Sequence, residues 1–210
     1  MENPRKTLAN TAKIFHVTHL PIPAISSYLI SFKDRRGKGK GLFVRDDQGD
    51  YWWELRACDY YHEFEKEKIV WDRITDIVGF SYIHRQYYLL DSTFFITGID
   101  LKYIIGILNS TVSIFWMKNT VATTLGKGMY GAKIYIEKLP IPRITAQNQE
   151  ITKQIEKFVD EILSITQSED YLQNPQKQSQ VKALEEEIDK LVYRLYDLTE
   201  EEINIIEEVG

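Results

Sequence analysis

The sequence predicts an α+β protein: a mixed or antiparallel, β-rich domain around a central apolar helix, followed by a C-terminal helical hairpin or coiled-coil spacer. Three observations predict this class. Up to about residue 142, short β-branched and aromatic runs alternate with Gly, Asp or Ser. After that point, apolar residues recur every three or four positions. The 210 residues, 43% of them hydrophobic and 12% aromatic, suffice for a sizeable core, which excludes wholesale disorder.

Short strands are expected throughout the first two-thirds of the chain, at residues 41–45, 51–56, 68–71, 77–83, 86–90, 93–97 and 133–136. One segment among them, residues 100–118, is too long and too evenly apolar for a strand. We therefore expect a helix there, with Asp100 as its N-cap, and a sheet that wraps around it. The proline motif at 139–142 is expected to be a rigid exit from an edge strand.

The last third of the sequence has the periodicity of amphipathic helices. Apolar residues recur at helical spacing in 151–163 and in 181–195, and the polar breaker 170–175 separates the two segments. Thr199 and Glu202 have the spacing of a capping box and predict a third, short helix. The expected domains are residues 1–143, of which 1–50 are poorly placed, and a helical spacer or dimerisation region at residues 147–210.

Charge is distributed unevenly along the chain. Residues 1–143 carry 20 Lys and Arg against 15 Asp and Glu, whereas residues 144–210 carry 6 against 16, within a net charge of −5. Such an acidic total is compatible with a polyanion partner when one face carries the positive charge. A single cysteine excludes a disulfide framework, and no apolar run approaches the roughly 20 residues that span a bilayer. We therefore expect a cytoplasmic protein without a membrane partner.

Motifs for catalysis and metal binding are scarce. The sequence lacks a nucleophile elbow, a Walker loop and a dinucleotide fingerprint. His16 and His19 have the close spacing of metal ligands, but Cys58 is the single cysteine and no second His pair follows. We therefore expect no catalytic residues, no metal site and no cofactor.

Two alternative functions stay open at this point. One is a metal-dependent nuclease that uses Asp91, Asp100 and Lys102, which predicts magnesium-dependent cleavage abolished by Asp100→Asn. The other is a protein-interaction subunit that acts through the acidic helical tail and whose cationic loops are incidental.

Two glycine-rich loops carry positive charge, and their glycines permit the backbone to approach a ligand closely. Residues 33–41 hold five cationic side chains and three glycines, and residues 123–133 form the second loop. Cations can neutralise phosphates, and an arginine can bind guanine through its bidentate fork. Each loop is equally well interpreted as an exposed hairpin tip whose charges increase solubility. Two such loops in one basic region nevertheless favour a nucleic-acid partner. The candidate DNA-binding residues are Lys33, Arg35, Arg36, Lys38, Lys40, Arg45, Lys127, Tyr130 and Lys133.

A series of segments in the middle of the chain resembles a known family. The segments are 51–56, 67–74, Phe80, 91–96, 101–110 and 138–142. The most specific part is Leu-Asn-Ser at 108–110 on the apolar helix, followed by Leu-Pro-Ile-Pro at 139–142. In order and spacing this series resembles the TaqI-like target recognition domain, the C-terminal specificity module of type IIG restriction-modification enzymes and related adenine-specific DNA methyltransferases. The helical tail is similar to the spacer of type I restriction specificity (methylase S) subunits.

The resemblance implies an α+β unit that reads one DNA half-site, while the methyltransferase lies in another domain or subunit. We therefore expect a non-catalytic, sequence-specific DNA recognition module of a restriction-modification system. Its expected partner is double-stranded DNA, and a DNA methyltransferase or a second copy of the chain are further candidate partners. Asn109 and Ser110 are expected to satisfy buried backbone groups rather than to contact DNA. Core packing is expected of the aromatic residues Trp52, Trp71, Phe80, Phe94 and Trp116.

Overall fold

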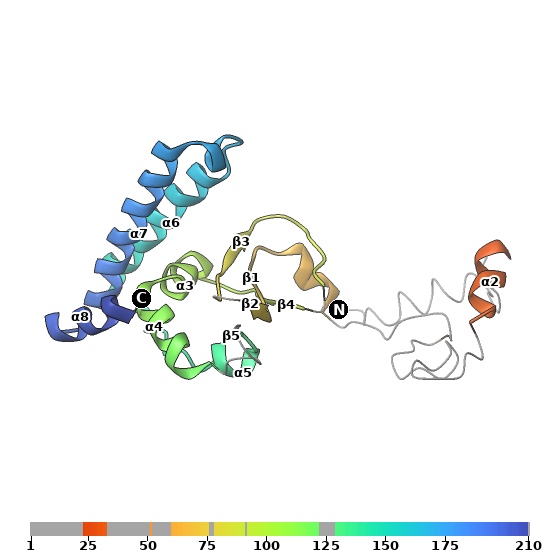
Figure 1. Ribbon diagram of the computed structural model, residues 1–210, viewed down its shortest axis with the longest axis horizontal. Coiled ribbons are helices and arrows are strands. Elements are labelled where there is room, and N and C mark those ends of the chain that lie inside the picture. The colour runs from red at the N-terminus through yellow and green to blue at the C-terminus, as the bar shows by residue number, and fades with distance from the viewer. Residues whose placement is uncertain are drawn as a thin grey trace. The chain divides into compact units, whose positions relative to one another are not determined.

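The computed structural model describes residues 23–32, 51, 60–75, 78–90, 92–121 and 129–209. The chain forms two compact units, Met1–Asp59 and Tyr60–Gly210. In the first unit, helix α2 (Pro23–Ile30) is described, and the second unit contains the other elements labelled in Figure 1. No helix in these described ranges is long and apolar enough to cross a membrane.

A small antiparallel sheet with strand order β3–β1–β4 opens the second unit (Figure 1). The central strand β1 (Lys68–Asp72) pairs with β3 (Ser81–Ile83) on one side and β4 (Thr93–Ile96) on the other. The 3-10 helix η2 (Tyr61–Glu65) precedes it. Trp71 of β1 is buried and packs against the rings of Phe80 and Phe94, so the inner face of the sheet is aromatic.

The expected helix at 100–118 is two helices, α3 (Leu101–Leu108) and α4 (Thr111–Thr120), separated by Asn109 and Ser110. The Ser110 hydroxyl accepts a hydrogen bond from the Ser113 N–H at 3.4 Å and thereby caps α4. Short polar side chains compete with the helix for backbone hydrogen bonds, which explains the break. Asp100 occupies the N-cap position of α3, but its backbone is left-handed (φ 56°) and its side chain makes no capping hydrogen bond.

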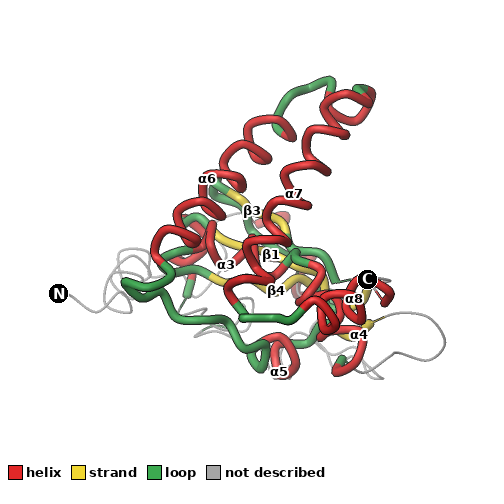
Figure 2. The backbone as a smooth tube through the Cα atoms, turned by 90° about the vertical axis from the view of Figure 1, so that its left-hand side faces the viewer, coloured by secondary structure: helices red, strands yellow, loops and turns green. Residues whose placement is uncertain are grey.

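Helix α3 lies between the sheet and the C-terminal helices (Figure 2). The hairpin consists of α6 (Gln149–Thr166), the short 3-10 helix η3 (Tyr171–Gln173) and α7 (Pro175–Leu195), and α8 (Glu200–Val209) packs on α4. A Cβ atom on Gly106 of α3 would lie 2.5 Å from Ile155 Cγ2 of α6. The missing side chain therefore lets these two helices pack closely. The central helix is thus sandwiched rather than wrapped by the sheet.

The α+β class is confirmed, and so are the strands expected at 68–71 and 93–97. The strand expected at 77–83 is shorter, and residues 86–90 have no regular structure, since none of the described strands pairs with them. The strand expected at 133–136 is wrong: these residues form the helix α5 (Lys133–Ile136), whose Ile136 is buried in the core. An apolar run of four residues fits either state, so tertiary packing decides it. The expected strand at 41–45 and most of 51–56 lie outside the described residues.

The three helices expected in the last third are confirmed as α6, α7 and α8. The capping box is present: the Glu202 carboxylate accepts from the Thr199 N–H at 2.9 Å, and the Thr199 hydroxyl accepts from the Glu202 N–H at 3.3 Å. These helices pack on α3 and α4 within the unit Tyr60–Gly210. The division into functional regions at 143–147 stays a prediction.

Candidate nucleic-acid interface

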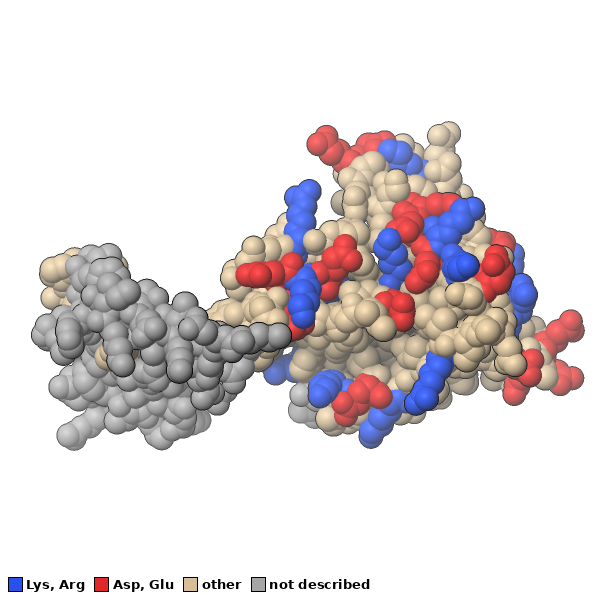
Figure 3. All heavy atoms as spheres, turned by 180° about the vertical axis from the view of Figure 1, so that it is seen from behind, with Lys and Arg blue, Asp and Glu red and all other residues tan. Residues whose placement is uncertain are grey.

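A row of exposed cationic side chains follows α4 and α5, two helices that contact each other. Figure 3 shows Lys and Arg side chains along the lower edge of the described part, where Figure 1 places α4 and α5. Among the described residues from 111 to 143, four side chains are basic and one is acidic. We call the four basic residues the basic edge: Lys118, Lys133, Lys138 and Arg143.

The chain is held firmly on both sides of segment 122–128, which lies outside the described residues. On one side Val121 is buried at the end of α4, and its N–H donates to the Met117 carbonyl at 2.9 Å. On the other side β5 (Met129–Tyr130) pairs with β2 (Ile74–Thr75). The Trp71 indole N–H then donates to the Gly131 carbonyl at 2.7 Å. The residues that flank this segment are therefore fixed in the fold on both sides.

Two tyrosines, one of them buried and one half-buried, hold the proline motif that follows α5. The Tyr103 hydroxyl on α3 donates to the Pro142 carbonyl at 2.8 Å, and the Tyr196 hydroxyl after α7 donates to the Pro140 carbonyl at 2.8 Å. Burial raises the pKa of each tyrosine to about 12, so both remain donors near neutral pH. The proline motif, which was expected to follow an edge strand, therefore follows a helix. The hydrogen bonds to its carbonyl groups fix the backbone between Lys138 and Arg143.

Lys133 is the one predicted DNA-binding residue whose side chain the structure describes. It is exposed on α5 and lies 3.7 Å from the Glu137 carboxylate, with 75% of its side chain accessible. An exposed pair of this kind contributes little, so the ammonium group remains available to a phosphate. Tyr130 lies in β5, and its side chain is outside the description. The other predicted residues lie outside the described ranges: Lys33, Arg35, Arg36, Lys38, Lys40, Arg45 and Lys127.

Three members of the basic edge were not among the DNA-binding residues predicted from the sequence: Lys118, Lys138 and Arg143. Lys138 and Arg143 flank the proline motif, and their position beside it was the available signal. Lys118 was assigned to the end of an apolar helix without a role. Its last-turn position on α4 becomes informative only through the contact between α4 and α5.

Asn109 makes the backbone contacts that were expected of it. Its side-chain oxygen accepts from the Phe80 N–H at 3.0 Å, and its side-chain amide donates to the Phe80 carbonyl at 2.9 Å. The Ser110 hydroxyl is buried and donates to the Ile107 carbonyl at 2.7 Å. Both residues of the break therefore act within the fold, as predicted. Core packing is confirmed for the aromatic residues Trp71, Phe80, Phe94 and Trp116, while Trp52 lies outside the described residues.

The residues of the nuclease alternative have other contacts where they are described. Lys102 forms an ion pair with Asp160 of α6 at 2.7 Å. Asp100 begins α3 and borders a hollow of about 210 Å³ together with Glu67 and Glu156. In the described part of the chain, no three His, Cys, Asp or Glu residues are arranged to hold a metal ion. Asp91 lies outside that part.

The chain was compared with protein families, and one part of it matches a family profile. This part includes the described residues of the interface up to Ile141. The profile of the TaqI-like C-terminal specificity domain matches residues 24–141. The matched region runs from α2 through α5 into the proline motif. No curated protein matches the sequence.

Proposed function

The chain belongs to the family of TaqI-like C-terminal specificity domains, and from this premise we propose that it is a non-catalytic module for sequence-specific recognition of double-stranded DNA in a restriction-modification system. The observation that carries the proposal is the family match over 24–141, a region that includes three of the four basic-edge residues and the anchors of segment 122–128.

The basic edge and the cationic loops would divide the work of recognition. Lysine and arginine contacts to phosphates position a protein on the duplex, whereas contacts to base edges supply the sequence information. Lys118, Lys133 and Lys138 are suited to the first task because they are exposed. We assign the second task to the predicted loops, 33–41 and the part of 123–133 that precedes β5, with an arginine such as Arg35 or Arg36 on a guanine.

The acidic helices would stay away from the duplex. Among residues 149–209, sixteen side chains are acidic and six are basic, so like-charge repulsion orients the basic edge toward DNA. We propose that this helical region contacts a DNA methyltransferase subunit or domain, or a second copy of the chain.

The test of sequence recognition is selection from a pool of randomised DNA duplexes by the full chain at two salt concentrations, followed by sequencing. We expect one short enriched motif and retention that falls steeply as salt rises. Salt-sensitive retention without enrichment would contradict sequence recognition by this chain alone. Absence of retention at low salt would contradict DNA binding. The same duplexes should remain uncut in the presence of magnesium.

The test of the basic edge is the double variant Lys133→Gln/Lys138→Gln. Each lost phosphate contact lowers the slope of log affinity against log salt by about 0.9, so the double variant should lower it by roughly 2 without changing the selected motif. The matched control is Lys153→Gln/Lys182→Gln, which removes two exposed charges from α6 and α7. An equal loss of slope in both double variants would contradict the assignment of phosphate contacts to the basic edge.

A further inference from the structure

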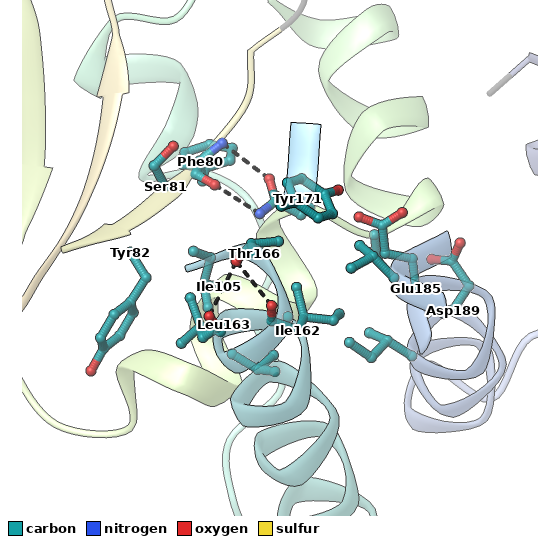
Figure 4. A pocket seen from close by; sticks show the side chains of 16 residues that line it. Phe80, Ser81, Tyr82, Ile105, Ile162, Leu163, Thr166, Tyr171, Glu185 and Asp189 are labelled. Carbon is teal, nitrogen blue, oxygen red and sulfur yellow. Dashed lines mark hydrogen bonds between the residues drawn. The ribbon is translucent and has the colours of Figure 1, made fainter. Parts of the chain in front are cut away.

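Two hollows, of about 370 Å³ and about 600 Å³, lie between the start of β3 and helices α3 and α7, and the smaller one also reaches α6. Because they share several lining residues, we treat them as one depression and call it the acidic groove. Figure 4 shows the smaller hollow, with Glu185 and Asp189 side by side on α7. The shared residues are Phe80, Ser81, Asn109, Glu185 and Asp189.

Side-chain hydrogen bonds hold the walls of the acidic groove. On one wall, the Asn109 side chain forms hydrogen bonds with both the N–H and the carbonyl group of Phe80. On the opposite wall, Asp189 ties α7 to the start of α4, because its carboxylate accepts from the Thr111 N–H at 2.8 Å and the Thr111 hydroxyl at 2.6 Å. The floor is apolar and is formed by Ile105, Val159, Ile162, Leu163, Val181 and Ile188.

The charge of the acidic groove is unbalanced. Glu185, Asp189 and Asp72 line it, whereas no Lys, Arg or His lines either hollow among the described residues. Asp72 accepts a hydrogen bond from the Thr93 hydroxyl at 3.0 Å, and Asp189 is bonded to Thr111. In the described part of the chain, the Glu185 carboxylate has neither an ion pair nor a hydrogen bond. It is therefore the group most open to a cation.

Two features of the carboxyl groups agree with a missing positive charge. Burial and then the nearby Asp189 raise the pKa of Glu185. Burial also raises the pKa of Asp189, the Thr111 hydrogen bonds oppose this rise, and Glu207 and Glu186 add to it. Glu185 is exposed as a whole residue, so it lies at the rim, where a ligand can reach it from solvent. A cation at this point would relieve the repulsion between the two carboxylates.

We propose that the acidic groove is a docking site for an arginine or lysine side chain of a partner protein. The apolar floor suits the aliphatic stem of such a side chain, and the two carboxylates suit its charged head. Duplex DNA is repelled by the same three carboxylates, which separates this surface from the basic edge. A bare metal ion has little use for an apolar floor, and the described residues include no cluster of three metal ligands. This proposal does not rest on DNA recognition.

The experiment uses two peptides that differ in charge alone: acetyl-Arg-Leu-Arg-amide and its counterpart with citrulline in place of both arginines. Each is titrated into the isotope-labelled full chain, and amide chemical shifts are followed. The arginine peptide should shift residues 80–82, 105–111 and 185–189, and the citrulline peptide should leave them unchanged. Equal shifts from both peptides, or shifts confined to α8, would overturn the proposal.

Variants of Glu185 test whether the arginine peptide binds at this side chain. Glu185→Gln should weaken the binding of the arginine peptide by roughly three- to tenfold, and Glu185→Lys should abolish this binding. The matched control is Glu186→Gln, which removes an equal charge from the next position of α7 and should bind as the unchanged protein does. Equal weakening by Glu185→Gln and Glu186→Gln would overturn the assignment. Saturation of the groove by spermidine at lower concentration than the peptide would identify a free polyamine as the occupant and also overturn it.

Retention of selected DNA duplexes separates the two proposals. Glu185→Gln should retain them like the unchanged protein, because Glu185 is not part of the basic edge. Failure of peptide docking with intact DNA retention would contradict the docking site alone. Intact peptide docking without DNA retention would contradict the proposed function alone.

Discussion

The basic edge and the C-terminal helices differ in charge and in the way they are held. The basic edge carries exposed cations on α4, on the short helix α5 and on the segment after it, and its backbone is fixed by two tyrosine hydroxyls. The C-terminal helices, with the segments that join them, carry sixteen acidic side chains over residues 149–209 and are fixed mainly by apolar packing on α3. Both regions rest on the same pair of helices, α3 and α4. Side chains of opposite charge are therefore segregated on the surface of one hydrophobic core.

The largest expected effect comes from Ile155→Ala, which tests whether the hairpin shares the core of the sheet. Ile155 is fully buried between α6 and α3, and truncation of such a side chain costs about 2–5 kcal/mol. Urea unfolding followed by tryptophan fluorescence and by helical circular dichroism should show one shared, earlier transition. The tryptophans lie outside the hairpin, so an unchanged fluorescence transition would show that the hairpin is an independent spacer.

The control for this variant is Ile205→Ala on α8. Ile205 is 55% exposed, so the same truncation removes little buried surface. Its effect on the free energy of unfolding should stay within about 0.5 kcal/mol. A cost comparable with that of Ile155→Ala would mean that helix propensity rather than burial sets the result.

Gly106→Ala tests the close approach of α6 to α3. The new Cβ would lie 2.5 Å from Ile155 Cγ2, and overpacking of this kind costs about 1–3 kcal/mol, of which better helix propensity offsets about 1 kcal/mol. We expect a net loss of up to about 2 kcal/mol in urea unfolding. Gly79→Ala is the matched control, because a Cβ there meets no atom within 4 Å. Equal costs at the two positions would refute close packing as the role of Gly106.

The same two regions show what could be predicted from the sequence. The long periodic segments at 151–163 and 181–195 were predictable because each repeats its apolar spacing over several turns. The helix at Lys133–Ile136 was not, because a four-residue apolar run fits a strand equally well until Ile136 enters the core. The break at Asn109 was also missed, since the partner of its side chain, Phe80, is 29 residues away.

The candidate sites follow the same logic. Lys133 was predicted from local charge near glycine, and it is exposed on α5, while its role in DNA binding stays a prediction. Glu185 lies in the run 185–187, which has the pattern of a solvated helix face. Packing of α7 alone decides that Glu185 lines the acidic groove while Glu187 pairs with Lys190. No local pattern separates these neighbours.

Asn174→Ala tests the free end of the hairpin, away from the core on α3. The Asn174 side chain caps α7 by accepting from the Gln176 and Lys177 N–H groups at 3.1 and 3.2 Å. Loss of an N-cap of this kind costs about 1 kcal/mol. We expect faster amide exchange in the first turn of α7 and little change near Ile155. Gln173→Ala is the matched control, and equal exchange in both variants would show that the cap contributes nothing.

The smallest expected effect concerns the pH dependence contributed by Glu185. Its pKa is raised in the folded protein by burial and by Asp189, so the folded state takes up this proton at higher pH than the unfolded state does. Stability contributed at this position therefore rises as pH falls from neutrality through the raised pKa toward the ordinary carboxyl range. Below that range both states are protonated and the gain is complete.

Glu185→Gln removes this titration while it keeps the size of the side chain. The variant should be slightly more stable than the unchanged protein at pH 7, by less than about 0.5 kcal/mol, and the difference should vanish as the pH approaches 4. Glu186→Gln is the control for removal of one carboxylate from α7, since Glu186 lies outside the acidic groove. Urea midpoints measured across this range provide the comparison. A Glu185→Gln protein that is less stable at pH 7 would mean that its carboxylate already has a favourable partner, so the groove would have no unmet charge to offer an arginine.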